Sequence, residues 1–205
     1  MSDSRAARAA INLIFSALFL GVAFSGYRYS LGDCCEMTFL SNVATGTVLF
    51  CTGIFMLAGF DAPHFLYLDC AVLMTTVFGV CAFFAPEVCF KGVSLLPHVV
   101  TPAAMLVFYF LFCDGRGCNP YYSFTALLFP FVYYAFMIAY GRITGGNIYT
   151  YFDTNVMSAL NLVFVGALAY VLLLVGALIL LYANKACRLV FGRLGRLAHN
   201  SRYLS

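Results

Sequence analysis

The sequence predicts an all-α, polytopic membrane protein with six transmembrane helices. Of its 205 residues, 63% are hydrophobic and only 9% are charged, and the mean hydropathy is +0.94. Soluble domains carry about 25% charged residues, so this chain has too few charges to cover a water-facing surface. An open strand would leave backbone groups unpaired in lipid, so we expect the membrane spans to be helices.

Six apolar segments are separated by clusters of Gly, Pro and charged residues, and each approaches the about 20 residues that a helix needs to cross the hydrocarbon layer. They cover residues 9–27, 37–59, 65–85, 95–113, 122–141 and 155–183. We therefore predict a transmembrane domain over residues 1–184 and a basic cytoplasmic tail over 185–205. An alternative interpretation of the first segment is a signal peptide with a small-residue cleavage site at 23–25, although Tyr27 and Tyr29 suit an uncleaved helix end.

The basic residues predict the orientation of the chain. Six spans place both termini on one side, and the positive-inside rule puts the more basic side in the cytoplasm. That side holds Arg5, Arg8, Arg116, Lys185, Arg188, Arg193, Arg196 and Arg202, whereas the opposite side holds Arg28, Lys91 and Arg142. In the tail, cations alternate with apolar residues, a pattern typical either of an amphipathic helix on an anionic leaflet or of a partly disordered topology signal.

Composition and motifs exclude several function classes. Six spans leave no room for a soluble nucleotide-binding or DNA-binding module, and the sequence has no Gly-rich phosphate loop, His-Glu-x-x-His pair or Gly-x-Ser-x-Gly elbow. We therefore expect no nucleic acid partner, no cofactor and no metal. Four of the nine cysteines lie in apolar segments, where cysteine behaves as a small hydrophobe, and Cys113 and Cys118 are too widely spaced for a zinc knuckle. Cys34, Cys35 and Cys89 fall on the outer side, where an oxidising compartment would allow a disulfide.

Polar residues inside the membrane are the informative ones, because such side chains are costly there without a partner or a task. The second span opens with Thr38, Ser41 and Asn42, whose spacing places them on one helical face. Such a face also serves as hydrogen-bonding contact between helices. The fourth span opens with His98, the histidine that lies within an apolar segment, and Pro102 cannot donate the usual backbone hydrogen bond to the His98 carbonyl.

A third group follows the fifth span and comprises Arg142, Tyr149 and Asp153. Arg142 also has a simpler interpretation as a side chain that extends to water, and Asp153 as a helix cap. The starts of the even-numbered spans and the ends of the odd-numbered spans face the same side of the membrane. Thr38, His98 and this third group are therefore predicted to lie at similar depth in one leaflet.

These residue types resemble the components of a hydrolytic site. A Thr38 hydroxyl needs a base to remove its proton as it attacks an ester carbonyl, and His98 is the neutral-pH base predicted at that depth. Asn42 is the best side-chain candidate for stabilising the oxyanion, with Ser41 second. Arg142 is a candidate for holding a lipid carboxylate by bidentate pairing.

Three local patterns, in this order, also carry a family resemblance. They are Thr-x-x-Ser-Asn at 38–42, His-x-x-x-Pro at 98–102, and Pro-Phe-Val-Tyr at 130–133 followed by Arg-x-x-Gly-Gly at 142–146 and the aromatic segment 149–153. The chain resembles, over roughly residues 10–180, the six-helix bacterial relatives of the androgen-induced and androgen-dependent transmembrane hydrolases. The eukaryotic members are threonine hydrolases of fatty acid esters of hydroxy fatty acids. The resemblance implies that Thr38 is the nucleophile and His98 the essential histidine.

Three hypotheses follow. The first is a membrane hydrolase of lipid esters that uses a Thr38–His98 pair in direct or one-water contact and takes its substrate sideways from the outer leaflet into a lipid-sized cavity. The second is a small transporter or channel with Asp33, Asp69, His98 and Arg142 as pathway residues. The third is a non-catalytic scaffold that binds membrane lipids, in which Thr38 and His98 lie on unrelated faces.

Overall fold

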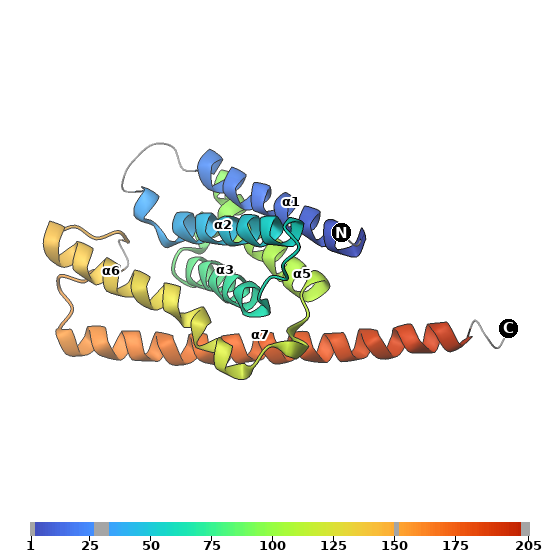
Figure 1. Cartoon of the computed structure of the whole chain (residues 1–205). Coiled ribbons are helices and arrows are strands. Elements are labelled where there is room, and N and C mark those ends of the chain that lie inside the picture. Colours follow the sequence, from blue (N-terminus) through green and yellow to red (C-terminus); the bar gives the residue numbers. More distant parts are fainter. Residues whose placement is uncertain (1–2, 27–32, 150–151, 202–205) are drawn as a thin grey trace.

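A computed structural model describes residues 3–26, 33–149 and 152–201 of the chain. Within these ranges the chain forms helices and no strand (Figure 1). Six segments are long and apolar enough to cross a membrane: Ser4–Ser25, Met37–Leu57, His64–Phe84, Gly92–Phe112, Pro120–Thr144 and Ala159–Phe191. These segments match the six predicted spans, so the protein has the all-α, multi-pass membrane fold that the sequence predicts.

Helix α1 (Asp3–Gly26) packs along α2 (Met37–Leu57) over most of its length. Gly46 allows this close approach, because a Cβ built on it would lie 2.7 Å from Cγ of Leu20. Two buried hydrogen bonds join the helices: the Ser16 hydroxyl donates to the Gly46 carbonyl (2.7 Å), and the Thr52 hydroxyl donates to Oδ1 of Asn12 (2.9 Å). In lipid, close packing and such polar contacts are what hold neighbouring helices together.

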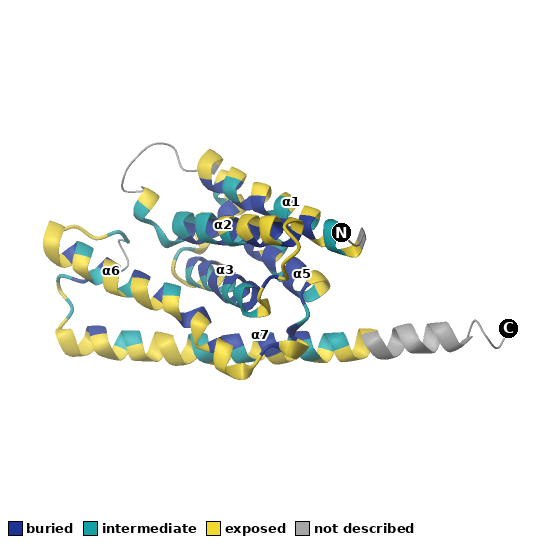
Figure 2. Ribbon diagram, viewed as in Figure 1, coloured by how far each residue is buried: buried dark blue, intermediate teal, exposed yellow. Residues whose placement is uncertain are grey.

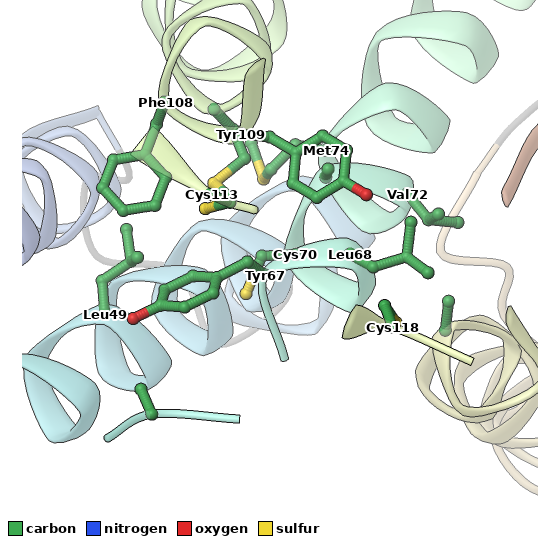
Figure 3. Packing of buried hydrophobic residues seen from close by; sticks show 14 of the residues in the cluster. Leu49, Tyr67, Leu68, Cys70, Val72, Met74, Phe108, Tyr109, Cys113 and Cys118 are labelled. Carbon is green, nitrogen blue, oxygen red and sulfur yellow. The ribbon is translucent and has the colours of Figure 1, made fainter. Parts of the chain in front are cut away.

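The core lies where α3 (His64–Phe84) meets α2 and α5 (Thr101–Phe112). Figure 3 shows the rings of Tyr67 and Phe108 beside Leu49, with Tyr109 and Met74 on the neighbouring side. All five side chains are at most 3% exposed. Because α3 is packed against several helices, it forms the central element of the bundle (Figure 2).

Helices α6 (Leu128–Thr144) and α7 (Ala159–Ser201) lie at one face of the bundle and carry mostly exposed residues (Figure 2). Many of the exposed side chains of α7 are large and apolar, as expected for a surface that contacts lipid. Short helical turns link the long helices: α4 (Pro86–Cys89), η1 (Asp33–Cys35), η2 (Gly92–Ser94), η3 (Leu96–Val100), η4 (Gly115–Gly117), η5 (Pro120–Ser123) and η6 (Thr125–Leu127).

The last helix is longer than the predicted span, which ended at residue 183, and it continues to Ser201 through most of the basic segment. Hydropathy marks where an apolar stretch ends, and a helix can continue beyond that point. Asn184, Lys185 and Arg188 all hydrogen-bond to backbone groups of residues 109–118 that precede α6. The start of the predicted tail is therefore attached to the bundle.

The first turn of α1 and the last turn of α7 lie toward the same end of the bundle, as an even number of spans requires (Figure 1). Arg28 and Arg202, which contribute to the predicted charge difference between the two sides, lie outside the described residues, and so do the side chains of Arg193, Arg196 and Asp33. Cys34, Cys35 and Cys89 are all free thiols, so the disulfide that the sequence left open is not formed among them.

Candidate functional site

The first turns of α2 supply one half of the candidate site. Thr38, Ser41 and Asn42 are all buried on one face of the helix, with exposed fractions of 7%, 0% and 0%. Glu36 precedes the helix and makes no side-chain cap to it. The predicted polar face thus exists and points into the protein.

A widened helical turn supplies the other half. Residues Leu96–Val100 form a π-type turn in which the backbone N–H of Thr101 donates to the Leu96 carbonyl, five residues back. Pro102 has no N–H to donate to the His98 carbonyl, so a regular α-helical turn cannot form there. Single π-type turns recur at functional sites because they displace one side chain from the regular helical register. Here the turn carries the buried His98.

The two halves meet directly. Oγ1 of Thr38 lies 3.2 Å from Nε2 of His98 in a buried contact, which confirms the predicted proximity of the two side chains. On the other side of the ring, Nδ1 lies 2.8 Å from the Ser94 carbonyl oxygen. A carbonyl oxygen only accepts, so Nδ1 carries the proton of the neutral ring. Nε2 is therefore the unprotonated nitrogen and accepts a hydrogen bond from the Thr38 hydroxyl.

Asn42 has a different position from the one expected of an oxyanion donor. Its Nδ2 donates to the Thr38 carbonyl at 2.8 Å and to the Pro97 carbonyl at 3.4 Å. Both of its N–H groups are thus engaged, and they join α2 to the turn that carries His98. The Ser41 hydroxyl is fully buried and makes no hydrogen bond with the described residues, so it is the side chain with a free donor.

Two tyrosine hydroxyls make hydrogen bonds to the backbone at the start of α2. The backbone N–H of Met37 donates to the Tyr149 hydroxyl at 2.8 Å, and the Tyr133 hydroxyl donates to the Cys35 carbonyl at 3.0 Å. The two hydroxyls lie 3.3 Å apart. Burial raises the pKa of the Tyr149 phenol, and the adjacent Tyr133 adds to the effect. Tyr149 was a predicted site residue and Tyr133 was not, although Tyr133 ends the Pro-Phe-Val-Tyr pattern that contributed to the resemblance.

Arg142 and Asp153 make their hydrogen bonds away from Thr38 and His98. The Arg142 guanidinium is exposed and donates to the Met157 carbonyl at 2.9 Å, and Asp153 accepts from the Asn155 N–H at 2.8 Å. Hydrogen bonds from Asn147 and Asn155 lower the pKa of the Asp153 carboxyl. Within the described ranges, neither residue hydrogen-bonds to Thr38 or His98. Their contacts order the connection between α6 and α7. These roles are close to the simpler interpretations of the two residues, in which Arg142 extends to water and Asp153 caps a helix.

An apolar cavity of about 170 Å³ lies next to the start of α2, between α3, α6 and α7. The end of the cavity near Thr38 is formed by Met37, Tyr133 and Tyr149. The part that lies farther along the membrane-spanning helices is lined by Thr76, Gly166 and Leu173. Thr38 and His98 themselves do not line it. Met37, which precedes Thr38 in the chain, and Tyr149, which accepts the Met37 N–H, link the cavity lining to the start of α2.

Comparisons with protein-family models, with curated proteins and with solved structures found no match to this chain. Among the described residues, no group of three or more His, Cys, Asp and Glu side chains is arranged to hold a metal ion.

Proposed function

We propose that the protein is a membrane hydrolase of lipid esters, with Thr38 as nucleophile and His98 as general base. The observation that carries this proposal is the buried 3.2 Å contact between Oγ1 of Thr38 and Nε2 of His98. A hydroxyl within hydrogen-bond distance of an oriented neutral imidazole is the arrangement that nucleophilic acyl transfer requires. The orienting acceptor, usually a carboxylate in such triads, is here the Ser94 carbonyl.

The reaction has two balanced steps. In the first, Oγ1 of Thr38 bonds to the ester carbonyl carbon while its proton passes to Nε2 of His98. The tetrahedral intermediate then expels the alcohol, which takes the proton from Nε2 and leaves an acyl-threonine. In the second step, His98 removes a proton from water, the water oxygen attacks the acyl carbon, and Thr38 is released with its proton restored. The products are one alcohol and one fatty acid.

The negative charge on the intermediate needs donors that are already in place. The Ser41 hydroxyl fits this requirement, because it is buried one helical turn from Thr38 and has no partner among the described residues. Asn42 acts instead as a positioning residue that fixes the distance between Thr38 and His98.

The substrate class follows from the location of the pair. Both residues are buried in membrane-spanning segments, and the adjacent apolar cavity extends from Met37 toward Leu173 on α7. Its lining is suited to an acyl chain, which would enter between helices from the lipid. The resemblance to the transmembrane threonine hydrolases supports the same substrate class. The termini are proposed to be cytoplasmic, which places the site in the outer leaflet.

Two other hypotheses receive less support. A scaffold role predicted that Thr38 and His98 would lie on unrelated faces, whereas they are in contact. A transport role would use Asp69, but Asp69 accepts a hydrogen bond from Thr125 and does not line the apolar cavity. The contact favours the hydrolase.

The test uses the full chain in phosphatidylcholine nanodiscs and a fluorophosphonate probe. The probe is expected to label the wild type, and tandem mass spectrometry should place the adduct on Thr38. Thr38→Ser keeps a hydroxyl and should retain labelling, and Thr38→Ala should abolish it. Thr75→Ala is the matched control, because among the described residues the Thr75 hydroxyl donates to the Ala71 carbonyl of its own helix.

Hydrolysis of butyrate, octanoate and palmitate esters of 4-methylumbelliferone measures turnover in parallel. Loss of both labelling and turnover in Thr38→Ala, with an unchanged Thr75→Ala, supports the proposal. Labelling or turnover that survives in Thr38→Ala would remove Thr38 as the nucleophile.

A further inference from the structure

Thr101 directly follows the π-type turn that carries His98, and its side chain is fully buried. Two donors of this residue point back into the turn. The backbone N–H donates to the Leu96 carbonyl, five residues back, and the hydroxyl donates to the Pro97 carbonyl, four residues back, at 3.2 Å. In a regular α-helix, the N–H itself bonds to the carbonyl four residues back. At the Pro97 carbonyl the hydroxyl therefore takes the place of the N–H.

The Pro97 carbonyl receives no backbone donor in either helical register. In the α register its donor would be the Thr101 N–H, which is committed to Leu96. In the π register its donor would come from Pro102, which has no N–H. Pro97 is buried, and a buried carbonyl without a donor is costly. Side chains must therefore supply the hydrogen bonds that the backbone does not.

Two side chains from different helices supply these bonds. The Thr101 hydroxyl donates to the Pro97 carbonyl from α5, and Nδ2 of Asn42 donates to it from α2 at 3.4 Å. A carbonyl oxygen has two lone pairs, so both acceptor positions of Pro97 are occupied. The Thr101 N–H consequently has no acceptor position left on Pro97, and it bonds to Leu96 instead. One residue thus uses its hydroxyl to direct its own N–H to the more distant carbonyl.

We propose that Thr101 is a positioning residue for His98, because its hydroxyl holds the preceding turn in the π register. Without the hydroxyl, the Thr101 N–H can move to the Pro97 carbonyl, which restores the ordinary α-helical hydrogen bond and narrows the turn. His98 lies inside this turn, so its ring would rotate away from its two partners, Oγ1 of Thr38 and the Ser94 carbonyl.

The effect of Thr101 on catalysis rests on the proposed function, whereas its effect on the His98 ring does not. A threonine hydroxyl commonly bonds to the carbonyl four residues back, as Thr75 does to Ala71 at 2.7 Å. That contact lies within the regular helix α3, where the Ala71 carbonyl also has its α-helical N–H donor. Thr101 differs because the Pro97 carbonyl lacks that donor.

The experiment compares Thr101→Val and Thr101→Ala, which lack the hydroxyl, with Thr101→Ser, which keeps it. The full chain is studied in phosphatidylcholine nanodiscs. Solid-state nitrogen NMR of protein with isotope-labelled histidine reports which ring nitrogen carries the proton, and the His98 signals are those missing from His98→Gln. The wild type and Thr101→Ser should show the Nδ1–H form. The other two variants should lose about half or more of that signal, because the ring no longer faces the Ser94 carbonyl.

The rate of fluorophosphonate labelling at Thr38 is measured on the same samples. A displacement of about 1 Å between reacting groups costs up to about 10²-fold in rate, so Thr101→Val and Thr101→Ala should label about 10- to 10²-fold more slowly than the wild type. Thr101→Ser should restore the rate. Recovery with a hydroxyl, rather than with a side chain of similar volume, separates a positioning role from simple packing.

Thr75→Val is the matched control, since it removes the same kind of contact from a regular helix, and it should change neither the His98 signal nor the labelling rate. A Thr101→Val protein that keeps both would overturn the proposal even if it melts at a lower temperature, because Thr101 would then serve stability alone. Equal losses in Thr75→Val would overturn it as well. If the wild type is not labelled, the hydrolase proposal fails, and the NMR comparison still decides whether Thr101 sets the turn.

Discussion

The carbonyl oxygen of Ser94 accepts a hydrogen bond from Nδ1 of His98 at 2.8 Å. This contact fixes which nitrogen of the ring carries the proton and directs the other nitrogen toward Thr38. Ser94 ends the short turn η2, and the π-type turn η3 follows at Leu96. The backbone of these turns therefore serves the orienting function that a third side chain serves in other hydrolytic sites.

His98→Gln is expected to lower the turnover of 4-methylumbelliferyl esters by about 10²–10⁴-fold, because general-base assistance contributes that much to a reaction. The double variant with Thr38→Ala should be no slower than the slower single variant, since the two residues act as a unit. Turnover numbers for the four proteins test this. Additive losses would contradict a shared role.

Asn42→Leu should destabilise the protein by about 1–3 kcal/mol, because it leaves the buried Thr38 and Pro97 carbonyls without this donor. It should also slow fluorophosphonate labelling of Thr38 if Asn42 sets the distance to His98. Thermal unfolding and labelling rate are measured together. Asn161→Ala, on an exposed position of α7, is the control and should stay within about 0.5 kcal/mol of wild type.

Tyr149→Phe removes the acceptor for the Met37 N–H at the start of α2. A hydrogen bond of this kind contributes about 0.5–1.5 kcal/mol, so we expect a stability loss of that size and slower turnover. A double-mutant cycle with Tyr133→Phe should show coupling, since the two hydroxyls lie 3.3 Å apart. Tyr121→Phe, at a side chain that is 77% exposed, should change neither quantity.

Ala169→Phe places a ring in the apolar cavity beside α7. It should lower kcat/KM for the palmitate ester by about tenfold or more while the butyrate ester keeps its rate, because only the longer chain needs the filled space. Val163→Phe changes the same helix at a side chain that is 69% exposed, and should leave both esters unaffected. Equal losses for both esters in Ala169→Phe would indicate that the cavity does not hold the acyl chain.

Gly46→Ala should destabilise the α1–α2 packing by about 1–3 kcal/mol, the usual cost of overpacking a close contact. The added Cβ would lie 2.7 Å from Cγ and 2.9 Å from Cδ2 of Leu20. Gly79→Ala is the matched control in α3, where a Cβ would meet nothing within 4 Å. Thermal unfolding in nanodiscs compares the two, and a Gly46→Ala protein as stable as Gly79→Ala would show that Leu20 moves aside freely.

The sequence by itself determined the fold class, because hydropathy and length leave helical spans as the available solution in lipid. It also placed Thr38 and His98 at similar depth, since both open even-numbered spans and parity fixes the side. The polar face of Thr38, Ser41 and Asn42 followed from helical periodicity, and the missing N–H of Pro102 signalled an irregular turn at His98.

Only the tertiary structure decided which of these groups touch. Depth in the membrane constrains one coordinate, whereas contact also depends on how the helices are arranged around the bundle and how each is rotated. For this reason Arg142 and Asp153, predicted at the same depth as Thr38, bond instead to their own connection between α6 and α7. For the same reason the amide of Asn42 reaches the Pro97 carbonyl of another span. Packing between helices, which single-span patterns do not encode, sets these contacts.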